Sequence, residues 1–242
     1  MSQERLQAHF DKEPISYLGR GNQVRVHGTT RLALKVDDPL TTVPAIIGDI
    51  YRQTLPQAKA GMGGLVLPFE MPAHIEAHEL HTRPHWVFFE KEERVPVHFA
   101  NPVVQERVDD HNRLRICMER VSRTSEANHF GDLLLAWVRL TVNRGFFPYE
   151  INPSNFVVCH GNLLLRDLGA IIGKGNGRRN VLRNKPEMER LAGMYADAYA
   201  PLLGDSDIAS AFRRRLTRLL VDAHREIRQE PSEAYPVPDL SF

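Results

Sequence analysis

Polar side chains that suit a metal site gather in the stretch PYEINPSNFVVCHGNLLLRDLG, residues 148–169. Two short apolar runs flank the turn-forming residues 160–162, which predicts a hairpin of two strands. Asn155 comes before the first run and Asp167 after the second, so strand pairing would bring both side chains to one point. An amide oxygen and a carboxylate presented together suit Mg²⁺, which takes few protein ligands and completes its shell with water and phosphate.

The same residues also have a structural interpretation. Asn155 and Asp167 could simply cap a tight hairpin, because short polar side chains bond readily to nearby backbone groups. Glu150, just upstream, could accept a proton from a hydroxyl group if it lay within hydrogen-bond reach. It could equally be a solvated loop acid.

A second group of candidate residues lies near the N-terminus. Gly19 and Gly21 fall in a predicted hairpin, where glycine lets backbone amides approach phosphates closely. Lys35 follows on the next predicted strand and could neutralise phosphate charge. The alternative is an ordinary turn and a solvated lysine, although the apolar neighbours of Lys35 in LALKV are unusual for a surface position.

The elements that would position these residues change along the chain. Residues 15–36 read as three strands, and the pieces LVLPF, HWVFFEK and RLRICME in the middle of the chain are strand-like. Helices are predicted at 129–144, 186–200 and 206–228, and a poorer one at 39–60, interrupted by Pro44 and Pro56. We therefore predict an α+β protein with a β-rich lobe at residues 1–121 and a helical lobe at 122–242. A small ligand would bind in a cleft between lobes.

Composition narrows the class of protein. The 242 residues are 42% hydrophobic and 25% charged, with a formal net charge of +1, which favours an ordinary globular protein without a nucleic-acid partner. No window approaches the eighteen apolar residues of a membrane span, and the N-terminus does not read as a secretory signal. The only two cysteines, Cys117 and Cys159, sit in apolar runs. We expect a cytoplasmic protein.

Taken together, the motifs resemble those of the protein-kinase-like superfamily. The resemblance rests on Gly19 and Gly21, Lys35, a hinge-like ICMERV at 116–121, EINPSN at 150–155 and DLG at 167–169. It covers roughly residues 15–200, and the order of all five elements fits. Within the superfamily, LGRGNQVRV and NPSNFVVCH are most similar to the small bacterial YrbL-like proteins of the PhoP regulatory network.

This resemblance implies a two-lobed kinase-like fold and a role for each matched residue. Gly19 and Gly21 would cover the phosphates of ATP, and Lys35 would contact its α- and β-phosphates. Asn155 and Asp167 would hold Mg²⁺. The backbone near Glu119 to Val121 would receive the adenine edge.

The sequence also departs from the kinase pattern. The His-Arg-Asp triplet of kinases is replaced by Pro148-Tyr149-Glu150, so a glutamate occupies the position of the catalytic base. The third glycine of the loop is Val24. The helix after Lys35 offers Asp49 instead of a glutamate as its partner, with Glu70 and Glu76 as less favoured substitutes.

Two further features invite interpretation. His74, His78 and His81 have helical spacing and would suit zinc only if the segment were one helix; a solvated polar segment is favoured. A basic run lies where kinases have an activation segment, and it either recognises an acidic substrate or is a solvated loop. Its members are Lys174, Arg178, Arg179, Arg183 and Lys185.

Three functions remain open on the sequence alone. The first is an ATP- and Mg²⁺-dependent phosphotransferase of the serine/threonine kinase type, acting on a hydroxyl of an unknown protein or small-molecule acceptor. The second is a pseudokinase that binds nucleotide or a partner without phosphoryl transfer, as Glu150 suggests. The third is a different nucleotidyl or small-molecule transferase on the same scaffold.

Overall fold

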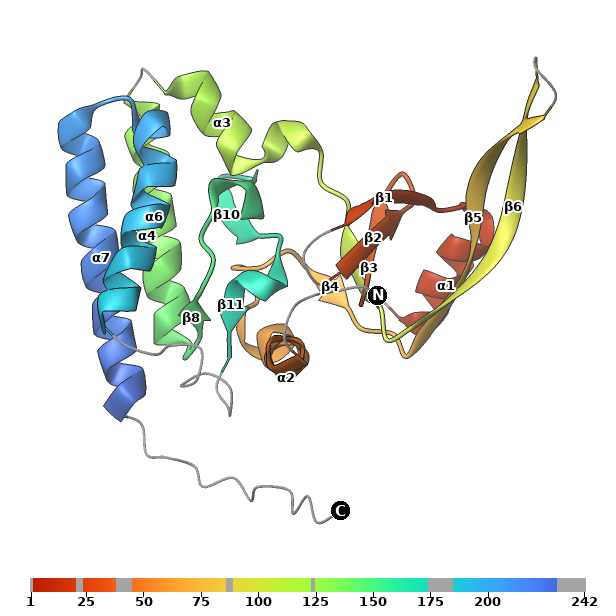
Figure 1. The fold of residues 1–242 in the computed structure, drawn as a ribbon, viewed down its shortest axis with the longest axis horizontal. Coiled ribbons are helices and arrows are strands. Elements are labelled where there is room, and N and C mark those ends of the chain that lie inside the picture. Colours follow the sequence, from red (N-terminus) through yellow and green to blue (C-terminus); the bar gives the residue numbers. More distant parts are fainter. Residues whose placement is uncertain are drawn as a thin grey trace, which may run out of the picture. The chain divides into compact units, whose positions relative to one another are not determined.

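The structure is a computed structural model that describes residues 2–20, 24–37, 45–85, 89–122, 125–173 and 185–229. The chain forms two compact units, Met1–Pro44 with Leu67–Val108, and Ala45–Val66 with Asp109–Phe242. Strands dominate the first unit and helices the second (Figure 1), which confirms the α+β class. Residues 45–66 and 109–121 group with the second unit, whereas the sequence suggested a division after Val121.

Five strands form an antiparallel sheet in the first unit, in the order β1-β2-β3-β7-β4. The first three confirm the strands predicted between residues 15 and 36. Because β3 lies in the middle of this sheet, its side chains are flanked by a strand on either side. The bounds are β1 Ser16–Arg20, β2 Val24–Gly28, β3 Leu32–Asp37, β4 Phe69–Glu70 and β7 Val103–Glu106.

A long hairpin is inserted between β4 and β7. Its strands, β5 His74–His85 and β6 Phe89–Ala100, pair in antiparallel fashion along their whole length (Figure 1). Ile15 holds β5 through two backbone hydrogen bonds, donating to the carbonyl of His78 at 2.8 Å and accepting from the amide of Leu80 at 2.9 Å. The hairpin thereby continues the first unit beyond its five-stranded sheet.

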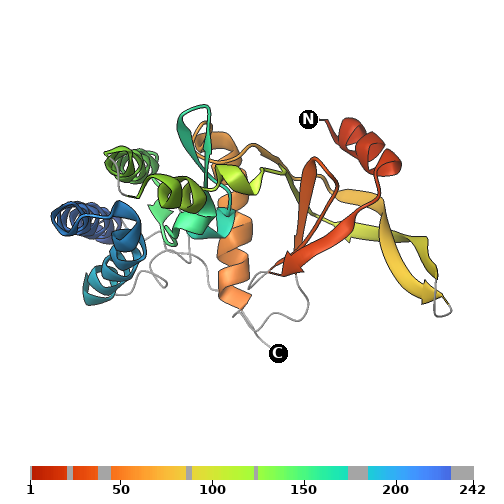
Figure 2. The same cartoon turned by 90° about the horizontal axis from the view of Figure 1, so that it is seen from above.

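Helix α1, Gln3–Lys12, covers the first unit beside β5 (Figure 2). Leu6 and Phe10, one helical turn apart, are buried, as expected for the apolar stripe of an amphipathic helix. They join a hydrophobic cluster that includes Leu34 of β3 and Val104 of β7. One face of the sheet is therefore closed by α1.

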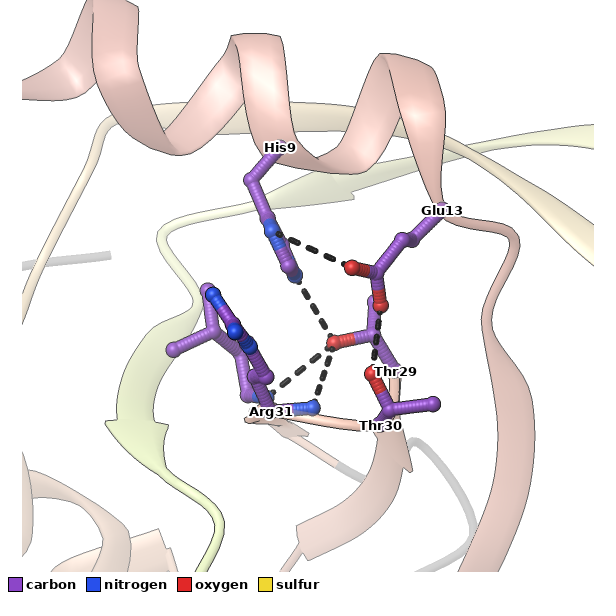
Figure 3. Close-up of polar contacts among 6 residues, drawn as sticks. His9, Glu13, Thr29, Thr30 and Arg31 are labelled. Atoms are coloured by element: carbon purple, nitrogen blue, oxygen red, sulfur yellow. Dashed lines mark hydrogen bonds and ion pairs between the residues drawn. The ribbon is translucent and has the colours of Figure 1, made fainter.

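A polar network fastens the end of α1 to the turn between β2 and β3 (Figure 3). The hydroxyl of Thr29 accepts from the amide of Leu32 at 3.1 Å and contacts Nε2 of His9 at 2.8 Å. Thr30 donates its hydroxyl hydrogen to Oε2 of Glu13 at 2.7 Å. This last bond is the main cause of a lowered pKa of Glu13.

Helices make up most of the second unit. They confirm the helices predicted at 129–144, 186–200 and 206–228 as α4, α6 and α7, which pack together and are seen nearly end-on in Figure 2. Their bounds are α2 Ala45–Gly61, α3 Leu114–Val121, α4 Glu126–Asn143, α6 Lys185–Leu203 and α7 Ser206–Gln229.

Helix α3 corrects one prediction, because RLRICME was expected to be a strand. Leu114 and Met118 are buried one helical turn apart, while Arg115 and Glu119 form an exposed pair of the same spacing with Nε and Oε1 2.8 Å apart. Leu114, Ile116 and Met118 also alternate along the sequence, so the same letters fit a strand with a period of two. The helical pattern prevails in the fold.

The core of the second unit joins segments that are distant in sequence. The indole Nε1 of Trp137 on α4 donates to the carbonyl of Leu65 at 2.8 Å, and its ring meets that of Phe156 edge-on at 4.8 Å. Leu165 donates its amide to the same carbonyl at 2.9 Å. The segment after α2 is therefore part of the support for the predicted site.

Candidate functional site

The predicted hairpin in the opening motif is present in the second unit. Its strands are β9 Phe156–Cys159 and β10 Asn162–Leu165, which pair in antiparallel fashion. The turn places His160 at φ 49° and Gly161 at φ 76°, both in the left-handed region. Glycine adopts this conformation without a steric penalty, which explains the residue type at the second position.

The open end of the hairpin brings Asn155 close to Asp167 along the backbone. The amide of Arg166 donates to the carbonyl of Asn155 at 2.7 Å, which continues the pairing one step beyond the last strand pair, Phe156 with Leu165. Asp167 follows Arg166 directly. The eleven residues between Asn155 and Asp167 are thus folded back, as the sequence predicted.

Asn155 is held by a short 3-10 helix, Pro153–Asn155, and only 9% of its surface is exposed. The amide Nδ2 donates to the backbone carbonyl of Glu150 at 3.2 Å. This bond identifies the nitrogen of the side-chain amide. The other atom of the amide, Oδ1, points away from the carbonyl of Glu150 and is the atom that can bind a cation. Asn152 begins the 3-10 helix by accepting from the amide of Ser154 at 3.0 Å.

Asp167 begins another 3-10 helix, Leu168–Ala170. Its Oδ1 accepts from the amide of Gly169 at 3.1 Å. The capping role proposed as an alternative is therefore real for one carboxylate oxygen. The cap also fixes the carboxylate at the mouth of the hairpin, and an amide oxygen and a carboxylate are donors that suit Mg²⁺.

Glu150 is attached to the same turn through the backbone. Strands β8 Phe147–Pro148 and β11 Ile171–Ile172 pair, and the chain continues from β8 into the predicted catalytic loop. The amides of Tyr149 and Glu150 both donate to the carbonyl of Ala170, at 2.8 and 3.0 Å. These bonds bring Glu150 beside the segment that carries Asp167.

The charges of Glu150 and Asp167 influence each other. Partial burial of its carboxyl group raises the pKa of Glu150, and the negative charge of Asp167 raises it further. Glu150 as a whole residue is exposed, so the burial effect is partial and the charge of Asp167 is the more informative cause. The two carboxylates therefore interact electrostatically.

One site residue, Tyr195 of α6, could not be found from the sequence. Its hydroxyl donates to the backbone carbonyl of Tyr149. Burial raises the pKa of Tyr195, and the negative charge of Glu150 adds to that effect. Because Tyr195 follows Glu150 by forty-five residues and has no motif around it, no local pattern indicates its role.

The predicted phosphate-binding residues belong to the first unit. Lys35 is half-buried on β3, between Val26 of β2 and Val103 of β7. Gly19 of β1 has φ 151° beside an irregularity in the strand pairing, and no atom lies within 4 Å of where a Cβ would be. Gly21 lies outside the described residues.

The predicted adenine-contacting segment is helical. Glu119 and Val121 lie in α3. Amides inside a helix bond to carbonyls four residues earlier and cannot serve a ligand at the same time. The nucleotide role of Glu119 and Val121 remains a prediction.

The acids considered as partners of Lys35 fall on different elements. Glu70 pairs with Val104, whereas Lys35 pairs with Val103. Adjacent residues of a strand point to opposite faces, so Glu70 and Lys35 lie on opposite faces of the sheet. Asp49 lies in α2, and its side chain is outside the described part of the structure.

The three histidines considered as a zinc site do not lie on a helix. His74, His78 and His81 lie on strand β5, so the helix that zinc would need is absent. Glu76 of the same strand lies 3.6 Å from His98, measured from Oε1 to Nδ1. Within the described residues, no three His, Cys, Asp or Glu side chains gather as metal ligands.

The basic run after Asp167 lies almost entirely outside the described part of the chain. Lys174, Arg178, Arg179 and Arg183 lie outside the described residues, and Lys185 is the first residue of α6. Recognition of an acidic substrate by this run therefore remains a prediction.

A cavity of about 600 Å³ opens in the first unit beside α1. Its lining includes Leu6, Leu32, Phe69 and Val104. Neither Gly19 nor Lys35 borders it, so it is not the predicted phosphate site.

No helix in the described ranges is both long and apolar enough to cross a membrane. Comparison with known proteins found no matching family model and no matching curated protein. Among solved structures, a match is the crystal structure of a Stt7 homologue from Micromonas algae soaked with ATP, with 14% identity and a TM-score of 0.44. It covers 90% of this chain and 75% of the other. At this level the likeness assigns neither a fold family nor an activity.

Proposed function

We propose that the chain is an ATP- and Mg²⁺-dependent phosphotransferase of protein-kinase-like fold that acts on a hydroxyl group. One arrangement carries the proposal: Asn155 and Asp167 stand at the open end of one hairpin, and Glu150 is bonded to both sides of that end. The donor set fits Mg²⁺, because the Nδ2 of Asn155 is engaged by the protein and its oxygen is left for a ligand.

The order of elements supports the same proposal. An antiparallel sheet with Lys35 on its third strand is followed along the chain by helices, a loop with Glu150 and Asn155, and a hairpin that ends at Asp167. This is the order in which kinases carry their phosphate-binding lysine, catalytic loop and metal-binding aspartate. The resemblance to YrbL-like proteins, a bacterial origin and a cytoplasmic location belong to the proposal.

Each residue has a defined task under this proposal. Gly19 and Gly21 present amides to the phosphates, and Lys35 neutralises charge on them. A bound Mg²⁺, held by Asn155 and Asp167, would supply electrostatic stabilisation of the transferred phosphoryl group. Glu150 accepts the proton of the acceptor hydroxyl. Its side chain is one methylene longer than the aspartate of kinases, so its backbone is shifted by about that length.

Replacement of Asp167 tests the metal role. We expect Asp167→Ala to abolish transfer of labelled phosphate from ATP with Mg²⁺ to casein and to the protein itself, because the metal loses its charged ligand. Asp222→Ala is the control, since Asp222 is an exposed residue of α7 paired with Arg225. Full activity of the Asp167 variant would contradict the metal role. Intact-mass measurement of the products separates phosphate from nucleotide addition.

A pseudokinase remains the second candidate, favoured by the glutamate at position 150 and by the helical segment at 114–121. Thermal unfolding with ATP and Mg²⁺ separates the two candidates. A higher unfolding temperature without phosphate transfer would favour a regulatory protein. Stabilisation together with transfer would favour the enzyme.

A further inference from the structure

The peptide unit that precedes Glu150 is fixed at both of its polar atoms. Its amide, on Glu150, donates to the carbonyl of Ala170 at 3.0 Å, and its carbonyl, on Tyr149, accepts from the hydroxyl of Tyr195. The carbonyl of Glu150 itself accepts from Asn155. The Cα of Glu150 is thereby restrained from both neighbouring peptide units.

Tyr195 differs from the other partners in where it comes from. Ala170 and Asn155 belong to the same loop and hairpin as Glu150, whereas Tyr195 belongs to α6, which packs against α7 and α4. Only 9% of the Tyr195 surface is exposed. Because burial and the charge of Glu150 raise its pKa, Tyr195 stays a neutral donor at physiological pH. It therefore connects the loop to a helix that packs against α4 and α7.

We propose that Tyr195 is a positioning residue, which orients the carboxylate of Glu150 by holding the carbonyl of Tyr149. The inference rests on the proposed function, since it assigns Glu150 the task of accepting the hydroxyl proton. Without the hydroxyl of Tyr195, the peptide unit before Glu150 keeps only the hydrogen bond from its amide to Ala170 and can rotate about that bond. A displacement of about 1 Å at a reacting group can cost a factor of ~100 in rate.

Two tyrosines on the same helix provide a matched comparison. Tyr195→Phe removes the hydroxyl that holds the loop and keeps the ring. Tyr199→Phe removes a hydroxyl one helical turn later, on a fully buried side chain for which the described structure shows no hydrogen-bond partner. Loss of a tyrosine hydroxyl from α6 is common to both variants, and only the first loses the contact with Tyr149.

The assay is phosphate transfer from labelled ATP with Mg²⁺ to casein. We expect Tyr195→Phe to lower kcat by a factor of ~10 to 100 while the KM for ATP changes less than about twofold. Tyr199→Phe should leave both values unchanged. Replacing Tyr195 by 4-aminophenylalanine, which can still donate, should restore most of kcat.

Hydrogen exchange adds a readout that does not depend on activity. In Tyr195→Phe, the amides of Tyr149 and Glu150 should exchange faster, while that of Leu165 keeps its rate. Faster exchange throughout the second unit, or a KM that rises together with the fall in kcat, would show a general structural role and overturn the inference.

Failure of the inference can be told apart from failure of the proposed function. If the wild-type protein transfers phosphate and Tyr195→Phe retains its kcat, the positioning role is wrong and the proposed function stands. If the wild-type protein transfers no phosphate, the proposed function is wrong and the positioning role of Tyr195 is wrong with it.

Discussion

At the level of single residues, the acids Glu150 and Asp167 of the candidate site oppose each other's ionisation. Partial burial raises the pKa of Glu150, and the negative charge of Asp167 raises it further, which means that the ionised pair is unfavourable in the folded protein. Nothing in the hairpin itself requires an acid at position 150, because the backbone of that residue makes the bonds to Ala170 and Asn155. The acid is therefore better explained by chemistry than by folding.

Neutralising Glu150 should stabilise the protein. In a buffer with a chelator and no divalent cation, we expect Glu150→Gln to raise the unfolding temperature by about 1–2 °C. The substitution removes the burial of a charge and its repulsion by Asp167. The effect is small because Glu150 is exposed and solvent weakens the repulsion. The same variant should lose phosphate transfer. Differential scanning calorimetry measures the shift.

Glu226→Gln is the control for this measurement, since Glu226 is an exposed acid on α7. A lower unfolding temperature for Glu150→Gln than for the wild type would show that the carboxylate stabilises the loop. The chemical explanation of Glu150 would then lose its support.

Among the elements, α1 has no counterpart in the sequence-based description, which treated the N-terminus only as a segment unlike a secretory signal. The helix could have been found from Leu6 and Phe10, whose spacing of four places both on one face. Its attachment could not, because the contacts of His9 with Thr29 and of Glu13 with Thr30 join residues 17 to 20 positions apart.

The attachment of α1 should weaken in acid. Because the pKa of Glu13 is lowered in the folded protein, its ionised carboxylate contributes stability above its ordinary pKa, and that contribution is lost as the pH falls through the lowered value. We expect hydrogen exchange of the α1 amides to accelerate more in the wild type than in Glu13→Gln as the pH is lowered below about 4. Exchange rates are first corrected for the intrinsic effect of pH.

Glu4→Gln, another exposed acid on α1, is the matched control and should follow the wild type. If Glu13→Gln also followed the wild type across this range, the bond from Thr30 would contribute nothing to docking of the helix.

Local signals explain which elements the sequence predicted correctly. The hairpin of residues 156–165 was predictable because its turn residues and apolar runs are adjacent in sequence. Helix α3 was mistaken for a strand because Leu114, Ile116 and Met118 satisfy both periods. A helix was considered for the segment that forms β5 because three of its histidines have helical spacing. The buried Ile75 and Ala77, however, alternate with other residues as a strand requires.

At the scale of the molecule, the two units are not consecutive pieces of the chain. Residues 45–66 belong to the second unit although the first unit continues after them. The carbonyl of Leu65 accepts from both Trp137 and Leu165, so this segment supports the helix α4 and the hairpin at once. A division after Val121 would separate it from both.

A fragment of residues 122–242 should therefore not fold as the second unit does. Trp137, 2% exposed in the structure, is the only tryptophan of that fragment, and we expect its emission to move to the wavelength of a solvated indole. The full chain with Trp86→Phe provides the reference, because Trp137 is then its only tryptophan. Blue-shifted emission and cooperative urea unfolding of the fragment would show that residues 45–66 are dispensable.

Only those residues of the candidate site that are close together in the sequence could be predicted. Glu150, Asn155 and Asp167 lie within eighteen residues, and the turn between them could be recognised from its residue types. Tyr195 reaches the site through the packing of α6, which depends on the whole helical unit. Packing of this kind leaves no pattern near Glu150.

The hairpin between Asn155 and Asp167 has a consequence for recognising related chains. Its open end holds the two side chains, while its closed end holds only the turn at His160 and Gly161. Adding one residue to each strand next to the turn would lengthen the ladder without disturbing the pairing at the other end. A separation of fourteen or sixteen residues would then place the same two groups as well as twelve does. Pattern searches that demand one fixed interval would miss such chains, whereas searches that allow even increments would find them.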